Sequence, residues 1–73
     1  MSLVKLDARG LRSPHPILKI AAMIPQLSEG DVLEVSADCE TFETDVRSWC
    51  VRMNKQLLST VSREGITVIQ INF

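Results

Sequence analysis

Residues 30–37 read GDVLEVSA, a stretch in which apolar and polar side chains alternate from Leu33 to Ala37. Leu33, Val35 and Ala37 fall on one face of an extended chain, with a glutamate and a serine between them on the other. Because side chains alternate between the two faces of a strand, the pattern predicts a half-buried strand. One face of that strand needs a layer packed against it, and the flanking segments should supply that layer.

The segment before this strand predicts a strand, a turn and a helix. Val4 and Leu6 share one face of an extended run over residues 3–7, and an Arg-Gly pair follows as a turn. Between residues 14 and 27, apolar side chains recur at helical intervals, which predicts an amphipathic helix with one buried stripe. Pro25 removes a backbone donor near its end, so the last turn is either kinked or already a loop.

The segment after the strand predicts a second helix and a closing hairpin. From Glu40 onward one helical stripe is apolar, and its members are Phe42, Val46, Trp49, Cys50 and Met53. Residues 57–63 and 66–73 are β-rich runs joined by Glu64-Gly65, which supplies the glycine that a tight hairpin commonly requires. In the last run apolar residues again alternate with polar ones, which fits a sheet packed on one side only.

The predicted order is strand, helix, strand, helix, strand, strand. We expect an α/β fold, a two-layer sandwich in which both helices cover one face of a mixed four-stranded sheet. The first two strands should be parallel, because a helix connects them. At 73 residues the chain has room for one core, so we expect a single domain over residues 1–73.

Composition argues against several function classes. The formal net charge is −1 and charged residues of both signs make up 23% of the chain, so no overall field would attract nucleic acid or an anionic membrane. Aromatic residues make up only 4%, which leaves few rings on which bases could stack. No apolar run has the length of a secretion signal or a membrane span. We therefore expect a cytoplasmic protein with no direct nucleic-acid or membrane partner.

The two cysteines, Cys39 and Cys50, match neither a metal-binding spacing nor a Cys-x-x-Cys motif. His15 is the only histidine and lies far in sequence from both, so we expect reduced thiols, no metal and no cofactor. Cys39 falls in the predicted loop before the second helix, where it is either an ordinary thiol or one made reactive by the helix N-terminus. Cys50 lies on the apolar stripe, where a cysteine usually packs as a small hydrophobe.

The turn that opens the first helix is the strongest candidate for a functional site. Ser13 stands at the predicted N-cap, where unpaired N–H groups and the helix dipole favour an anion. Four side chains add positive charge around it, namely Arg9, Arg12, His15 and Lys19. This favours an acidic partner or ligand, although an ordinary N-cap serine followed by proline is the simpler interpretation. A serine nucleophile is disfavoured, since His15 has no assured geometry as its base.

Residues 6–16, LDARGLRSPHP, resemble the signature of the TusA/SirA sulfur-carrier family, which reads Leu-Arg-Cys-Pro-x-Pro at its centre. The likeness continues through residues 30–35 and through Asp45, Trp49 and Met53, and it covers almost the whole chain without gaps. The Asp38-Cys39 pair looks more like the YedF branch of that family than like TusA itself.

The resemblance implies a carrier that accepts sulfane sulfur from a cysteine desulfurase as a persulfide and passes it to an acceptor protein, toward tRNA thiolation or other pathways. It also implies that position 13 is the catalytic, sulfur-bearing site. For the turn and the helix start we expect a partner-binding surface, and its residues are Arg9, Gly10, Arg12, Pro14, His15, Pro16 and Lys19. Here, however, position 13 is serine, and an oxygen cannot form a persulfide. His15 departs from the acidic residue that TusA-like members often carry, which makes the turn more basic.

Three interpretations of Ser13 follow. Ser13 is a Cys→Ser change introduced into an otherwise active carrier, which is then disabled as written. Alternatively, the chain is a natural member of the family that binds or regulates sulfur-transfer partners without carrying sulfur. In the third interpretation the chemistry moves to Cys39, whose loop follows the second strand at the same end of the sheet as the Ser13 turn.

Overall fold

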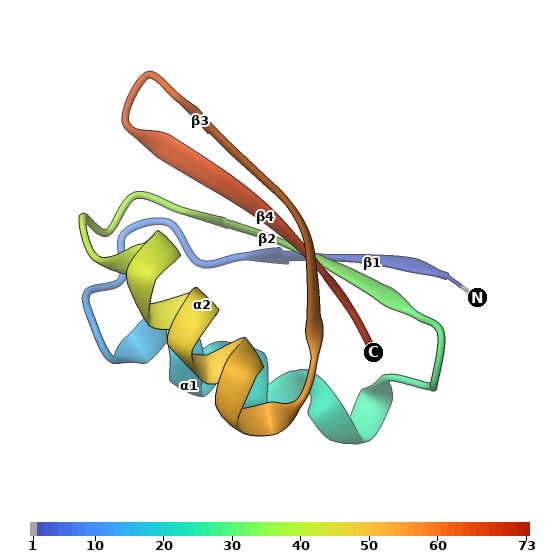
Figure 1. Ribbon diagram of the computed structural model, residues 1–73. Helices are drawn as coiled ribbons and strands as arrows, with labels where there is room; N and C mark the ends of the chain where they lie inside the picture. Colours follow the sequence, from blue (N-terminus) through green and yellow to red (C-terminus); the bar gives the residue numbers. More distant parts are fainter. Residues whose placement is uncertain (1) are drawn as a thin grey trace.

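The computed structural model describes residues 2–73, and its elements follow the predicted order (Figure 1). These are β1 (Leu3–Asp7), α1 (His15–Met23), the short 3₁₀ helix η1 (Ile24–Gln26), β2 (Val32–Ala37), α2 (Phe42–Met53), β3 (Gln56–Arg63) and β4 (Ile66–Asn72). The first helix is shorter than predicted, since α1 ends at Met23 and the chain continues as η1 through Pro25. Proline has no N–H to donate, and the backbone tightens into a 3₁₀ turn there.

The sheet is mixed and four-stranded, as predicted, with the strand order β1-β2-β4-β3. β1 pairs with β2 in parallel, and β4 is antiparallel to both β2 and β3. Val35 lies at the centre of the sheet, opposite Leu6 of β1 on one side and Ile69 of β4 on the other. Both helices cover the same face of the sheet (Figure 1), which confirms the two-layer α/β arrangement.

The core fills the space between the two helices and the covered face of the sheet. Its largest fully buried side chains are Ile20, Phe42 and Val46 from the helices and Leu33, Val35, Ile69 and Ile71 from the strands. Each such side chain contributes about 1.5–3 kcal/mol relative to leaving it exposed. Met53, predicted on the buried stripe, is 45% exposed. It is the last residue of α2, and at the C-cap Asn54 the backbone turns away with a left-handed φ of 56°.

The other face of the sheet is open within residues 2–73, and polar side chains cross it from strand to strand. Gln70 of β4 donates to Glu34 of β2 over 3.0 Å and accepts a hydrogen bond from Ser59 of β3 over 3.3 Å. Lys5 of β1 lies 4.0 Å from the other oxygen of Glu34. These contacts join all four strands through polar side chains, which fits a sheet that packs its other face against the helices.

The closing hairpin turns at Glu64 and Gly65, which have φ values of 53° and 81°. Positive φ at both central residues is what the favoured two-residue hairpin turns require, and glycine adopts it without steric cost. The predicted role of this glycine is confirmed. Within residues 2–73 no helix is both long enough and apolar enough to cross a membrane.

Candidate functional site

A hollow of about 450 Å³ opens at the end of the molecule where both helices begin. Arg12 and Ser13 line it from the turn before α1, and Cys39, Glu40 and Thr41 line it from the segment before α2. The two segments meet because β1 and β2 are parallel, so that their carboxyl ends lie at the same edge of the sheet. Figure 1 shows them side by side at the left of the molecule. The juxtaposition expected in the third interpretation of Ser13 is therefore present.

Ser13 is not the N-cap of α1, and the sequence prediction was wrong on this point. Pro14 is the N-cap, and it provides no side-chain cap because it carries no hydrogen-bonding group. The N–H of His15 instead donates to the carbonyl of Arg12 over 2.8 Å. The Ser13 hydroxyl is directed to α2, where it donates to Oδ2 of Asp45 over 2.9 Å. Ser13 therefore links the turn to the second helix and does not close the first one.

Asp45 accepts two hydroxyl hydrogen bonds on the same oxygen. Besides Ser13, the Thr41 hydroxyl donates to Oδ2 over 2.9 Å. Thr41 is the N-cap of α2, yet its side chain makes no capping hydrogen bond. Both hydroxyls at the two helix starts are thus used to hold one carboxylate. Sequence reasoning missed Asp45 as a site residue, although its spacing of four residues from Thr41 places the two on one helical face.

Cys39 is a half-buried free thiol in this hollow, with its Sγ 3.5 Å from the Thr41 hydroxyl oxygen. The pKa of Cys39 is lowered, first by the Thr41 hydroxyl and then by the backbone N–H groups of Thr41 and Ser13. Partial burial and the negative charge of Asp45 act in the opposite direction. A thiol with a lowered pKa forms thiolate, its nucleophilic form, more readily than an ordinary cysteine.

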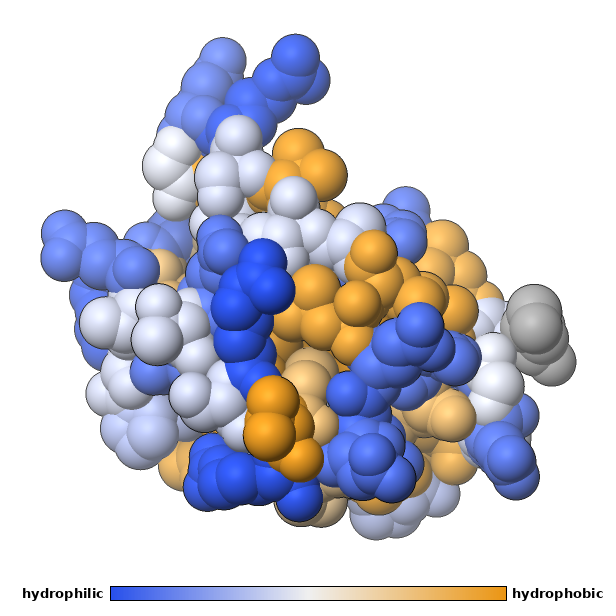
Figure 2. All heavy atoms as spheres, in the orientation of Figure 1, coloured by the Kyte–Doolittle hydropathy of each residue, from blue (hydrophilic) through white to orange (hydrophobic). Residues whose placement is uncertain are grey.

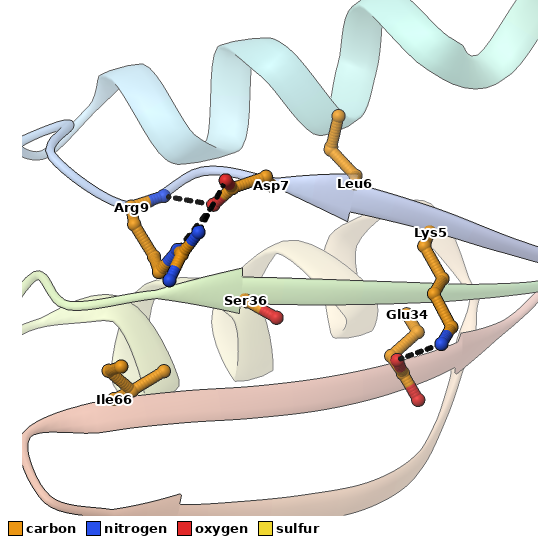
Figure 3. A pocket seen from close by; sticks show the side chains of 7 residues that line it. All are labelled: Lys5, Leu6, Asp7, Arg9, Glu34, Ser36 and Ile66. Atoms are coloured by element: carbon orange, nitrogen blue, oxygen red, sulfur yellow. Dashed lines mark hydrogen bonds and ion pairs between the residues drawn. The ribbon is translucent and has the colours of Figure 1, made fainter.

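The predicted partner-binding residues do not gather in one place. Arg12 lines the hollow, but Arg9 is hydrogen-bonded to both carboxylate oxygens of Asp7, at 2.9 and 3.0 Å. That pair borders a separate hollow of about 310 Å³ on the open face of the sheet (Figure 3). The Arg9 side chain is the main cause of a pKa of about 2 for Asp7. Lys19 of α1 is also engaged, because its Nζ donates to the backbone carbonyl of Asp7 over 2.8 Å.

The remaining residues of the turn differ in exposure. Gly10, Pro14 and His15 are exposed, whereas Pro16 is buried against the core. The N–H of Gly10 donates to Oδ1 of Asp38 over 2.9 Å, which ties the turn to the segment that carries Cys39. Nδ1 of His15 lies 3.2 Å from the Arg12 carbonyl oxygen.

The mouth of the hollow carries both signs of charge. Arg12 supplies a positive charge there, but Glu40 lines the same hollow and Asp38 lies next to Cys39 in the chain. Figure 2 shows mostly hydrophilic side chains on the left of the molecule, where both helices begin, and apolar ones gathered nearer the middle. The turn is basic in sequence, but folding brings acidic residues from the other segment beside it.

Among residues 2–73 there is no group of three or more His, Cys, Asp and Glu side chains placed to hold a metal ion. Cys50, the second thiol, is 3% exposed in the core, and burial raises its pKa. Of the two cysteines of the chain, Cys39 alone lines the hollow.

Fold and site together define a small α/β domain that presents a half-buried thiol beside a proline-flanked turn. Residues 4–72 match the family model described as "Sulfurtransferase TusA". Because the match covers nearly the whole chain, this protein belongs to the TusA sulfurtransferase family, as the resemblance of residues 6–16 predicted. Membership points to a sulfur-carrier role and to sulfur-transfer partners in general.

Proposed function

We propose that this protein is a sulfur carrier that takes sulfane sulfur from a cysteine desulfurase and passes it to an acceptor protein, with Cys39 as the sulfur-bearing residue. The observation that carries the proposal is the position of the Cys39 thiol in the hollow that Ser13 also lines. Position 13 is where the signature that the chain resembles has its cysteine. The lowered pKa of Cys39 supports the assignment, because the thiolate is the form that attacks a persulfide.

Ser13 keeps a structural part in this proposal. Its oxygen forms no persulfide, and its hydroxyl is occupied with Asp45. Its backbone N–H, however, is one of the groups that lower the pKa of Cys39. A relay through position 13 is disabled in this chain, while the backbone of the same turn still stabilises a negatively charged sulfur next to it.

The transfer needs no external oxidant or reductant. The Cys39 thiolate attacks the outer sulfur of the persulfide on the desulfurase, and the S–S bond of the donor breaks as a new S–S bond forms on Cys39. The donor cysteine leaves as a thiolate and takes up a proton from solvent, which balances the proton that Cys39 released. The acceptor protein then removes the outer sulfur by the same exchange, on a route toward tRNA thiolation. We place the reaction in the cytoplasm, where thiols stay reduced.

The partner surface in this proposal is the rim of the hollow. Arg12 lines the hollow, and Gly10, Pro14 and His15 are exposed on the same turn, where a docking protein could contact them. Pro16 supports the rim from the core, while Arg9 and Lys19 contribute less, because Asp7 already holds both.

Ser13 favours a second candidate function. If Cys39 takes no sulfur, the hollow and its rim would still bind a desulfurase or an acceptor. The chain would then be a binding or regulatory member of the family that does not carry sulfur.

The test is intact-mass analysis after incubation with a cysteine desulfurase and cysteine in the absence of reductant, with controls that lack the desulfurase. We expect the unmodified chain to gain one reductant-sensitive sulfur atom and Cys39→Ser to gain none. Ser13→Cys serves as the positive control for docking, since it restores the cysteine of the signature. A sulfur gained by Ser13→Cys alone would contradict the role of Cys39 and show that the chain as written has a disabled sulfur site and can only bind its partners. No gain in any of the three proteins would overturn the carrier assignment itself.

A further inference from the structure

The single hydroxyl proton of Thr41 has two possible acceptors, Oδ2 of Asp45 and Sγ of Cys39. The Thr41 hydroxyl has one proton, and Oδ2 of Asp45 receives it over 2.9 Å. The same hydroxyl oxygen lies 3.5 Å from Sγ of Cys39. While the Thr41 proton is on Asp45, the Cys39 contact requires that the thiol donate its own proton to the Thr41 oxygen. This arrangement suits the neutral thiol.

The thiolate needs the opposite arrangement. To stabilise a negatively charged sulfur, the Thr41 hydroxyl has to turn its proton from Asp45 toward Cys39. Asp45 opposes this step, because it would lose one of its two hydroxyl donors and would face a second negative charge nearby. Asp45 and the Cys39 thiolate therefore compete for a single proton donor.

We propose that Asp45 is a positioning residue that holds the Thr41 hydroxyl proton away from Cys39 and so restrains the reactivity of Cys39 in the free protein. The inference deepens the proposed function, and it rests on Cys39 as the reacting thiol. Asp45 does not touch the transferred sulfur and acts through Thr41. The Thr41 hydroxyl, where it turns toward the sulfur, and the backbone N–H groups of Thr41 and Ser13 favour the thiolate in the same hollow. The protonation of Cys39 is therefore set by the balance between these donors and Asp45.

Other charged groups border the hollow on each segment that forms it. Arg12 lies on the turn before α1, and Asp38 and Glu40 lie on the segment before α2. Asp38 is hydrogen-bonded to the Gly10 N–H, which directs its carboxylate to the turn. These three groups are unchanged in the variants proposed below. Their electrostatic effect on Cys39 is therefore the same in each variant and does not contribute to the differences in alkylation rate.

The test is the rate of alkylation of Cys39 by iodoacetamide between about pH 6 and pH 10, because the rate follows the thiolate fraction. Peptide mass spectrometry separates Cys39 from Cys50. We expect Asp45→Asn to speed alkylation of Cys39 at pH 7 by about three- to tenfold and to shift the pH profile to lower pH by up to about one unit. The rate at high pH, where the thiol is fully ionised, should change little.

Thr41→Val supplies the background that isolates the mechanism, since it removes the proton for which Asp45 and Cys39 compete. In that background we expect Asp45→Asn to change the rate by less than about twofold, so the two substitutions should be strongly non-additive. If Asp45→Asn accelerates alkylation equally in both backgrounds, Asp45 acts through its charge alone and the positioning role is wrong. An unchanged or slower rate for Asp45→Asn would also overturn the inference.

Two further variants keep the result interpretable. Thr41→Ser retains the hydroxyl and should restore the response to Asp45→Asn that Thr41→Val removes. Asp45→Ala provides the same test without an amide side chain that could still contact Thr41, and circular dichroism shows whether each variant is folded. The readout needs no desulfurase. Restraint by Asp45 can therefore fail while Cys39 still accepts sulfur, or hold while sulfur transfer fails, and the two results are distinguishable.

Discussion

The two cysteines of this protein occupy regions of opposite physical character. Cys39 lies half-buried in a hollow with a hydroxyl and two amide N–H groups near its sulfur, and these groups lower its pKa. Cys50 lies on α2 among the apolar side chains of the core, where burial raises its pKa. The same type of side chain is thus suited to nucleophilic chemistry at position 39 and to core packing at position 50. The difference comes from the neighbours that the fold supplies.

The two regions also differ in how polar groups are used. Around Cys50 the helix packs through apolar contacts, and the core contributes most of the stability. Around Cys39 neither helix start has a side-chain cap, because the N-cap of α1 is Pro14 and the hydroxyl of Thr41, the N-cap of α2, is bonded to Asp45. A cap is typically worth about 1 kcal/mol. Both helix starts beside the hollow therefore lack the stabilisation that a side-chain cap would give.

The largest expected contrast is in thiol accessibility. We predict that iodoacetamide alkylates Cys39 on the order of a thousandfold faster than Cys50 at about pH 8, because Cys50 becomes accessible only when the core opens. Timed quenching followed by trypsin measures both rates at once, since cleavage after Lys19, Arg47 and Arg52 places the cysteines on peptides 20–47 and 48–52. Comparable rates would show that α2 opens locally at Cys50 and would remove the contrast.

A matched pair of substitutions sharpens the comparison in terms of stability. Cys50→Ser places an unpartnered hydroxyl in the core and should lower the free energy of unfolding by about 1–3 kcal/mol. Cys39→Ser changes a half-buried position with polar neighbours and should cost less than about 0.5 kcal/mol. Urea unfolding followed by circular dichroism measures both. If the two costs were equal, the hollow would have to be as tightly packed as the core.

A second matched pair tests which arginine belongs to the site. Arg12→Ala should slow desulfurase-dependent sulfur loading by about three- to tenfold, because Arg12 lines the hollow and its charge favours anionic sulfur. Arg9→Ala should leave loading within about twofold, since Arg9 is bound to Asp7 on the open face. Initial rates of mass gain give both values. A larger effect at Arg9 would place partner docking on the open face.

The smallest expected effect is a pH dependence far from the site. The pKa of Asp7 is lowered from 3.8 to about 2, mainly by the Arg9 side chain. Because the folded-state pKa lies below the unfolded one, the stability contributed by Asp7 is fully present above about pH 4 and is lost as the pH falls toward about 2. We predict a small difference in Tm between the unmodified chain and Asp7→Asn that shrinks over this range. A difference independent of pH would show that the pair does not act through the charge of Asp7.

The sequence predicted the fold well because the fold is carried by periodicity. Alternation in residues 32–37 and the helical stripe of α2 identify the elements and the face that each one buries. The deviations are local and depend on end geometry. Pro25 sets where α1 ends, and Met53 is exposed because the chain reverses at Asn54. Periodicity carries no information about how a helix terminates.

The site was only partly predictable. Parallel strands place the Ser13 and Cys39 segments at one edge, and topology alone gives this result. The role of Asp45 is not visible in sequence, because it depends on which direction two hydroxyls take once Pro14 occupies the N-cap. The separation of Arg9 from Arg12 has a similar cause. Asp7, two residues before Arg9, binds its guanidinium on the open face, and sequence proximity had grouped both arginines around Ser13.

The central claim is that sulfur is carried at Cys39, and the most direct measurement locates the added sulfur within the unmodified chain. The protein is loaded by a cysteine desulfurase, the persulfide is trapped by alkylation and the chain is cleaved with trypsin. Mass spectrometry should find the extra sulfur on peptide 20–47, which contains Cys39, and none on peptide 48–52. Sulfur on peptide 48–52, or on neither peptide, would contradict the account.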